Sequence, residues 1–170
     1  MKETLPSGAA RWQILSYRRA VADLRALLSG VSEEAASEVP HPKLKNIVWH
    51  VGHLAWVRMT YIQELCPAYT GDWQLSAPEW KIYETGSAPP LLPEAYPPLS
   101  KLLHRYELAH QAWMNYLSAL SEKDLQTTLE GYGEGTPLGD LLTFLSEHEA
   151  YHRGQIGLLR TLNGHERVFG

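Results

Sequence analysis

Residues 138–163 carry the pattern that most limits how this chain can fold. Four apolar side chains and two histidines follow one another there in steps of three and four: Leu141, Leu145, His148, His152, Ile156 and Leu159. This spacing is typical of one face of an α-helix that is turned towards a core. Thr136 and Pro137 suit the cap and the first position of that helix, and Asn163-Gly164 suits its end. We therefore expect a long helix with both histidines on its inward face.

Three earlier segments show the same helical spacing of apolar residues. We expect a first helix from the cap Ser7 to about residue 29, a second from just after Pro42 to residue 65 or 66, and a third over residues 99–120. The second is apolar nearly all round through its middle, which is typical of a helix buried on most sides. The sequence thus predicts an all-α fold, a four-helix bundle with a long connection between helices two and three, formed by a single domain over residues 1–170.

The long connection, residues 67–98, is broken by prolines and shows no regular periodicity. Its aromatic residues are Tyr69, Trp73, Trp80, Tyr83 and Tyr96. A loop of this length is usually functional or disordered, and the aromatic content argues against disorder. We expect it to pack over the bundle, where its aromatic side chains either wall a pocket or plug one end of the core.

Charge and cysteine content exclude several classes of protein. The net charge is -4 and Lys and Arg form no cluster, so we expect no nucleic-acid partner. The single cysteine, Cys66, rules out a disulfide framework within the chain and favours a reducing, cytoplasmic location. The first residues lack a signal-peptide pattern, and no apolar run is long enough to span a membrane, so no membrane partner is expected.

His148 and His152 are four residues apart, which places both imidazoles on the same helix face. Neutral imidazoles in this arrangement can bind one divalent metal ion, and zinc is the usual candidate for a site with an open position. The alternative is a pair of core histidines without a metal. The stretch also fits H-E-x-x-H, the zinc peptidase pattern, but no third histidine follows at the spacing that peptidases use. We therefore expect no peptidase activity, and Glu149 need not act as a general base.

A third metal ligand must come from upstream, and the second helix offers His50 and His53. Their directions on that helix differ by only about 60°. One apolar stripe would turn His50 inward and another would turn His53 inward, so periodicity does not choose between them. On the third helix, His104 and His110 lie off the apolar stripe and are expected at the surface.

Two stretches of the chain resemble the DinB-like (DinB/YfiT-type) family of metalloenzymes. Residues 148–155 read H-x-x-x-H-R-G-Q, which resembles the motif on the last long helix of the family, and residues 49–56 resemble its H-L-A segment on the second helix. The order and spacing of the four helices are also similar. The resemblance implies that His53 completes a metal site with His148 and His152, and that His50 is a neighbour in the pocket.

The resemblance also implies a function. It implies a divalent metal ion, zinc or nickel, and a homodimer. Family members with an assigned activity are similar to thiol-dependent S-transferases or isomerases that use bacillithiol or mycothiol, or are partner domains in the synthesis of a sulfur-containing histidine betaine. A metal ion with an open position can activate a thiolate or a water molecule. We therefore expect transfer of a low-molecular-weight thiol to a small electrophile; the alternatives are a metal-dependent hydrolase and a non-catalytic bundle that binds metal or a stress ligand.

Several further residues are candidates for the surroundings of the metal. Trp49 and Trp56 lie four residues before and three after the third ligand, and would shield a metal ion from water. Glu149 and Gln155 are candidate hydrogen-bond partners for the ligand imidazoles, and the alternative is that both are solvated. Gly154 stands in mid-helix, where it costs about 1 kcal/mol relative to alanine, and the close approach of a neighbouring helix would explain it.

Overall fold

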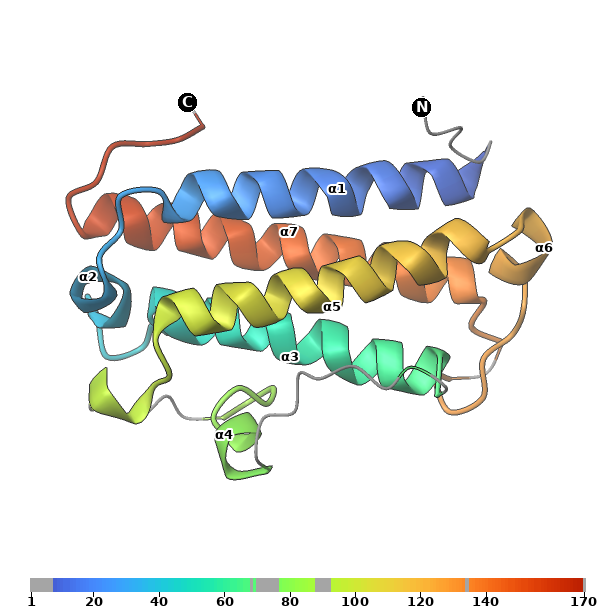
Figure 1. Cartoon of the computed structure of the whole chain (residues 1–170), viewed down its shortest axis with the longest axis horizontal. Coiled ribbons are helices and arrows are strands. Elements are labelled where there is room, and N and C mark those ends of the chain that lie inside the picture. Colours follow the sequence, from blue (N-terminus) through green and yellow to red (C-terminus); the bar gives the residue numbers. More distant parts are fainter. Residues whose placement is uncertain (1–7, 68, 70–76, 88–92, 134, 170) are drawn as a thin grey trace.

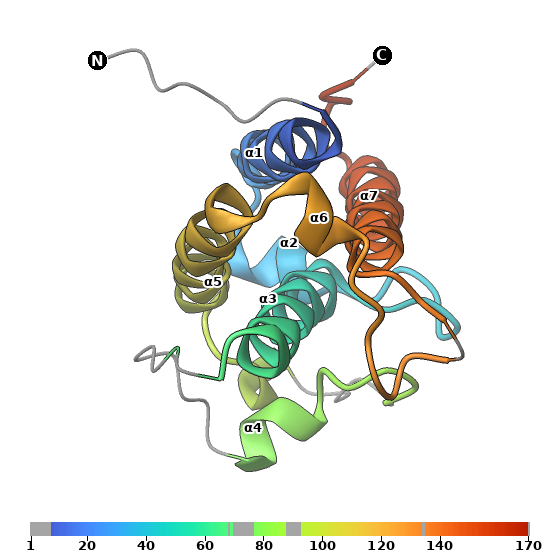
Figure 2. The same ribbon diagram turned by 90° about the vertical axis from the view of Figure 1, so that its right-hand side faces the viewer.

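Four long helices make up the body of the protein: α1 (Ala9–Leu28), α3 (Ile47–Leu65), α5 (Leu99–Ala119) and α7 (Leu138–Leu162). The structure is a computed structural model of the chain, and it describes residues 8–67, 69, 77–87, 93–133 and 135–169. Viewed along the bundle, α1 lies diagonally opposite α3, and α5 lies diagonally opposite α7 (Figure 2). No β-strand occurs within these residue ranges. The predicted all-α four-helix bundle is confirmed.

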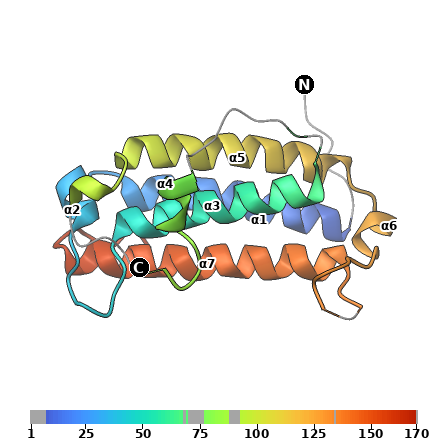
Figure 3. The same ribbon diagram turned by 90° about the horizontal axis from the view of Figure 1, so that it is seen from below.

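The directions of the helices explain the long connection between the second and third of them. In Figures 1 and 3, α1 and α7 run one way along the bundle, whereas the neighbouring helices α3 and α5 both run the other way. Because parallel neighbours need a crossover, the chain must return along the length of the bundle. The connection contains the short helix α4 (Ala77–Lys81) and a 3-10 turn (Pro93–Ala95), and α4 lies outside α3 (Figure 1).

Apolar side chains from all four long helices fill the interior. The side chains without any exposed surface include Ile14 and Leu24 of α1, Leu54 of α3, Leu102 of α5 and Leu142 of α7. Burying one such side chain contributes roughly 1.5–3 kcal/mol. This packing fixes α3 against α7, so that side chains on their facing sides have defined positions. No helix in the described part of the chain is long and apolar enough to cross a membrane.

The second long helix begins later than the sequence indicated. It starts at Ile47 rather than just after Pro42, because the Asn46 side chain accepts a hydrogen bond from the backbone N–H of Trp49 at 2.8 Å and caps the helix. The preceding segment contains the short helix α2 (Glu33–Ser37). The predicted cap of the first helix, Ser7, lies outside the described residues.

The last helix also starts slightly differently. The short helix α6 (Glu122–Leu125) is followed by a hairpin-like loop in which Leu129 donates its N–H to the carbonyl of Thr136 at 2.9 Å. The cap position is occupied by Pro137, and the Thr136 hydroxyl donates to a carbonyl within the loop instead of capping the helix. At the far end, Gly164 has φ 82, which confirms the predicted C-terminal stop.

Candidate metal centre

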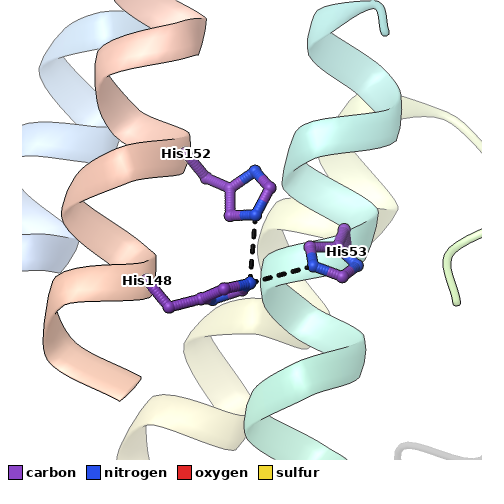
Figure 4. Close-up of side chains that lie close together, drawn as sticks. All are labelled: His53, His148 and His152. Carbon is purple, nitrogen blue, oxygen red and sulfur yellow. Dashed lines mark hydrogen bonds between the residues drawn. The ribbon is translucent and has the colours of Figure 1, made fainter. Parts of the chain in front are cut away.

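Three histidines from two facing helices meet between α3 and α7 (Figure 4). The Nε2 atom of His148 lies 3.1 Å from Nε2 of His53 and 3.0 Å from Nε2 of His152. One ligand atom from each of the three imidazoles lies within 4.8 Å of the others, so the group could hold a metal ion. Nitrogen atoms that are each about 2.0–2.1 Å from one ion must lie within about 4 Å of one another. The two distances from Nε2 of His148 meet this condition.

The orientation of His53 is set by the long connection. Its Nδ1 atom lies 2.6 Å from the carbonyl oxygen of Tyr83. Because a carbonyl only accepts, Nδ1 carries the proton, and Nε2 presents a lone pair to the two histidines of α7. The Trp49 ring stacks on the imidazole with centroids 4.7 Å apart, and the Trp56 ring lies 5.6 Å away. Both tryptophans therefore flank His53, and its side chain is only 2% exposed.

His50 lies beside the three-histidine group. It contacts the Nδ1 edge of the His152 ring, which is the edge away from the other two histidines of the group. The Nδ1 atoms of His50 and His152 are 2.9 Å apart, while Nε2 of His152 faces His148. The helical pattern left open which histidine of the second helix turns inward. Both face α7, but it is His53 that joins His148 and His152 in one group.

The imidazoles of this centre are held in their neutral form. Burial lowers the pKa of His50 and of His53 to about 4, and charge repulsion from neighbouring histidines adds to the effect. Burial and the other imidazoles lower the pKa of His152 to about 2, and burial lowers the pKa of His148 as well. Neutral imidazole is the form that binds metals. The Nε2 atom of His53 presents a lone pair to the other two Nε2 atoms. A cation between these nitrogen atoms would bind all three lone pairs, whereas hydrogen bonds among the rings would pair only some of them.

A slot on α3 lets the long connection reach His53. A Cβ atom built on Gly52 would lie 2.1 Å from Cε1 of the Tyr83 ring, and that ring is fully buried. Trp49 holds the same segment by donating its indole N–H to the carbonyl of Ile82 at 2.6 Å. The absence of a side chain at residue 52 therefore allows the connection to pack against α3 and to place a carbonyl at His53. For residues 77–87, which the structure describes, the expectation that the connection packs over the bundle is confirmed, whereas Trp73 lies outside the described residues.

Glu149, one of the two candidate partners for a ligand imidazole, binds other side chains instead. It is one residue, and hence about 100°, further round α7 than His148. Its carboxylate is buried, and it accepts hydrogen bonds from Nε and Nη2 of Arg58, the latter at 2.7 Å, and from the Tyr106 hydroxyl at 3.2 Å. Arg153 adds a weaker contact at 3.7 Å. The glutamate of H-E-x-x-H therefore joins α7 to α3 and α5.

Sequence reasoning missed the partners of this glutamate. Arg58 is a charged residue in the mainly apolar middle of α3, and it is buried. A buried guanidinium requires a carboxylate partner, because an unpaired buried charge is very unfavourable. That signal was present in the sequence and pointed to an acidic residue on a facing helix.

The remaining candidates have mixed outcomes. Gln155 is partly exposed, and no hydrogen bond within the described ranges joins it to an imidazole. A Cβ at Gly154 would meet nothing within 4 Å, so the approach of a neighbouring helix does not explain this glycine. His104 is exposed as predicted. His110 is half-buried, and burial followed by the charge of nearby arginines lowers its pKa to about 3, so its predicted surface position is wrong.

A cavity of about 340 Å³ opens beside the three histidines, between α3, α7 and residues 85–86 of the connection. Its walls are mostly aromatic or aliphatic: Trp49, Trp56, Val57, Tyr61, Phe144 and Leu145. Small-molecule sites in proteins are concave and mainly apolar, with a few polar groups that fix orientation. The three imidazoles supply such groups at one place in this wall.

Comparison with known proteins places the chain in a family. Residues 16–156 match the model of the DinB superfamily. The chain belongs to this superfamily. Among solved structures, a conserved protein from Enterococcus faecalis has the same fold, with a TM-score of 0.71 over 92% of this chain and 98% of that chain, at 17% sequence identity. The search of curated proteins gave no match. Membership agrees with the resemblance seen in the sequence motifs, and in this DinB-superfamily chain the three histidines that the motifs indicated lie in one group.

Proposed function

We propose that His53, His148 and His152 bind one divalent metal ion, zinc or nickel. The observation that carries this proposal is the convergence of three neutral, largely buried Nε2 atoms from two helices. The proton on Nδ1 of His53 is fixed by the Tyr83 carbonyl, which leaves the coordinating atom free. A carbonyl behind a ligand imidazole is the usual arrangement in metal sites. Three histidine ligands leave a position open for water or substrate.

We further propose that the protein is an enzyme that transfers a low-molecular-weight thiol to a small electrophile. When bound, the metal would supply Lewis-acid activation of a thiol or of water. Trp49 and Trp56 keep bulk water away from His53, and the cavity wall binds the apolar part of a substrate. Cys66 lies 13 residues after His53, about 20 Å along α3, so the thiol must come from a co-substrate.

Metal-dependent hydrolysis is the second candidate. Hydrolysis of the peptidase type uses the glutamate of H-E-x-x-H as a general base. In this protein, Glu149 is occupied by Arg58 and Tyr106 in the interior of the bundle. This arrangement argues against the peptidase mechanism and favours attack by a thiol over attack by water.

Metal analysis of the purified protein, followed by a conjugation assay, tests both proposals. We expect one metal ion per chain, lost in His53→Ala, His148→Ala and His152→Ala but retained in His104→Ala, a matched exposed histidine on α5. Full retention of the metal in the three variants would refute the site. In the assay, an aromatic halide is incubated with a panel of low-molecular-weight thiols. Metal-dependent loss of halide together with thiol indicates transfer, loss of halide alone indicates hydrolysis, and no reaction with any thiol supports a non-catalytic role.

A further inference from the structure

The cavity beside the histidines follows one face of α3. His53, Trp56, Thr60 and Glu64 occupy successive turns of that helix, in steps of three and four, and all of them line the cavity. Glu64 follows His53 by eleven positions, which corresponds to about 16 Å along the helix axis. The cavity is therefore elongated, with imidazoles at one end, a carboxylate at the other and apolar walls between them.

The charge of the cavity comes from its far end. Among the lining residues in the described part of the chain, Glu64 is the one with a carboxylate, and none is a lysine or arginine. Lys45 is close by, with its ammonium 4.7 Å from the centre of the Trp49 ring, but it does not line the cavity. A positively charged group at the far end would meet an acid, whereas an anionic group would be repelled.

Two tyrosine rings lie near the carboxylate of Glu64, which is exposed to solvent. The Tyr132 hydroxyl, from the loop before α7, donates a hydrogen bond to Glu64, and the Tyr61 and Tyr132 rings lie 6.0 Å apart. Burial and the charge of Glu64 raise the pKa of Tyr61, so its hydroxyl stays protonated, and the face of a neutral phenol ring attracts cations. A carboxylate beside such rings is the environment that recognises ammonium groups, and quaternary ammonium in particular, through charge and cation–π attraction.

We propose that this cavity binds an elongated organic cation. Its ammonium group lies at Glu64 and Tyr61, its apolar body lies along Trp56 and Phe144, and its other end reaches the histidines. The volume of about 340 Å³ is near the lower end of the range for small-molecule sites, so one small molecule fills it. The proposal rests on the proposed metal function only for the end that reaches the histidines. A co-substrate with carboxylates at the far end does not suit this cavity.

A matched pair of probes tests the proposal on the full-length protein as purified. Phenylpropyl-trimethylammonium carries a positive charge that cannot coordinate a metal ion. Its neutral isostere, in which carbon replaces the nitrogen, has the same shape. Quenching of tryptophan fluorescence reports binding, because Trp49 and Trp56 line the cavity. Both probes are titrated into the wild-type protein, into Glu64→Gln, and into the control Glu38→Gln, which removes an exposed carboxylate outside the cavity.

We expect Glu64→Gln to weaken binding of the cation by about threefold or more and to leave the isostere unchanged, and Glu38→Gln to change neither. Equal weakening of both probes, no change for the cation, or no binding of the cation to the wild-type protein would overturn the proposal. Metal content is measured on the same samples. A charge effect without bound metal would contradict the proposed metal function alone, and bound metal without a charge effect would contradict the cavity proposal alone.

Discussion

Replacing Gly52 with alanine is expected to disturb both the fold and the metal site. The new Cβ atom would lie 2.1, 2.4 and 2.5 Å from three carbon atoms of the Tyr83 ring, whereas such atoms normally stay about 3.5–4.0 Å apart. The ring is rigid and fully buried, so either it or α3 must move by about 1 Å or more. Overpacking of this kind costs about 1–3 kcal/mol in the free energy of unfolding.

The same movement reaches the metal site through the backbone of residue 83. The Tyr83 carbonyl accepts the proton of His53 Nδ1 at 2.6 Å, and displacement of the ring displaces this carbonyl. Loss of a partner behind a ligand imidazole usually lowers metal affinity by about 10–100-fold. Urea unfolding of the metal-free protein measures the first effect, and a competitive metal titration measures the second.

Gly154→Ala provides the matched control, since it makes the same substitution inside a long helix. A Cβ atom at residue 154 would meet nothing within 4 Å, so alanine should raise the free energy of unfolding by about 0.5–1 kcal/mol and leave metal affinity unchanged. In addition, Gly52→Ala should cost little more in a Tyr83→Ala background, because the clashing ring is gone. If Gly52→Ala proves as harmless as Gly154→Ala, the packing argument is wrong.

Three further predictions concern other parts of the molecule. Glu149→Ala should destabilise the protein by about 3–5 kcal/mol in urea unfolding, because it leaves Arg58 buried without a partner, whereas the exposed Glu147→Ala should change stability by about 0.5 kcal/mol or less; equal effects would contradict the buried ion pair. His50→Ala should weaken metal binding by about 10–100-fold without abolishing it, since His50 contacts His152 Nδ1 from outside the group; metal titration showing complete loss would make His50 a ligand. The homodimer implied by the family stays a prediction, and the outer face of α7, where Tyr151 is 62% exposed, is the surface that we expect it to use; sedimentation should show a dimer at micromolar concentration that Tyr151→Glu dissociates, and a monomeric wild-type protein would refute it.

The parts of the fold that depend on local patterns were predictable from the sequence. The stripe on α7 placed His148 and His152 on the inward face because helical periodicity is a property of neighbouring residues. Local patterns do not predict the choice of His53 over His50, because the two stripes on this apolar helix point in directions only about 60° apart. That choice depended on the family motif, and the structure groups His53 with the two histidines of α7.

Contacts between distant segments explain what the sequence did not reveal. The partner of His53 is the backbone carbonyl of Tyr83, and every residue has such a carbonyl, so no side-chain pattern marks it. Gly52 was visible as a glycine in a helix, but the ring that fills its slot comes from a connection without periodicity. The start of α3 differs from the predicted one because Asn46, a good cap residue, begins the helix, and not Pro42.

The central claim is that His53, His148 and His152 hold one metal ion, and anomalous diffraction from crystals of the metal-loaded protein tests it most directly. Data collected on either side of the absorption edge of the bound metal identify the element and locate it. We predict a single anomalous peak between α3 and α7, about 2.0–2.1 Å from Nε2 of each of the three imidazoles if the ion is zinc. A peak bound by His50 in place of His53, or no peak at these residues in crystals grown with saturating zinc and nickel, would contradict the claim.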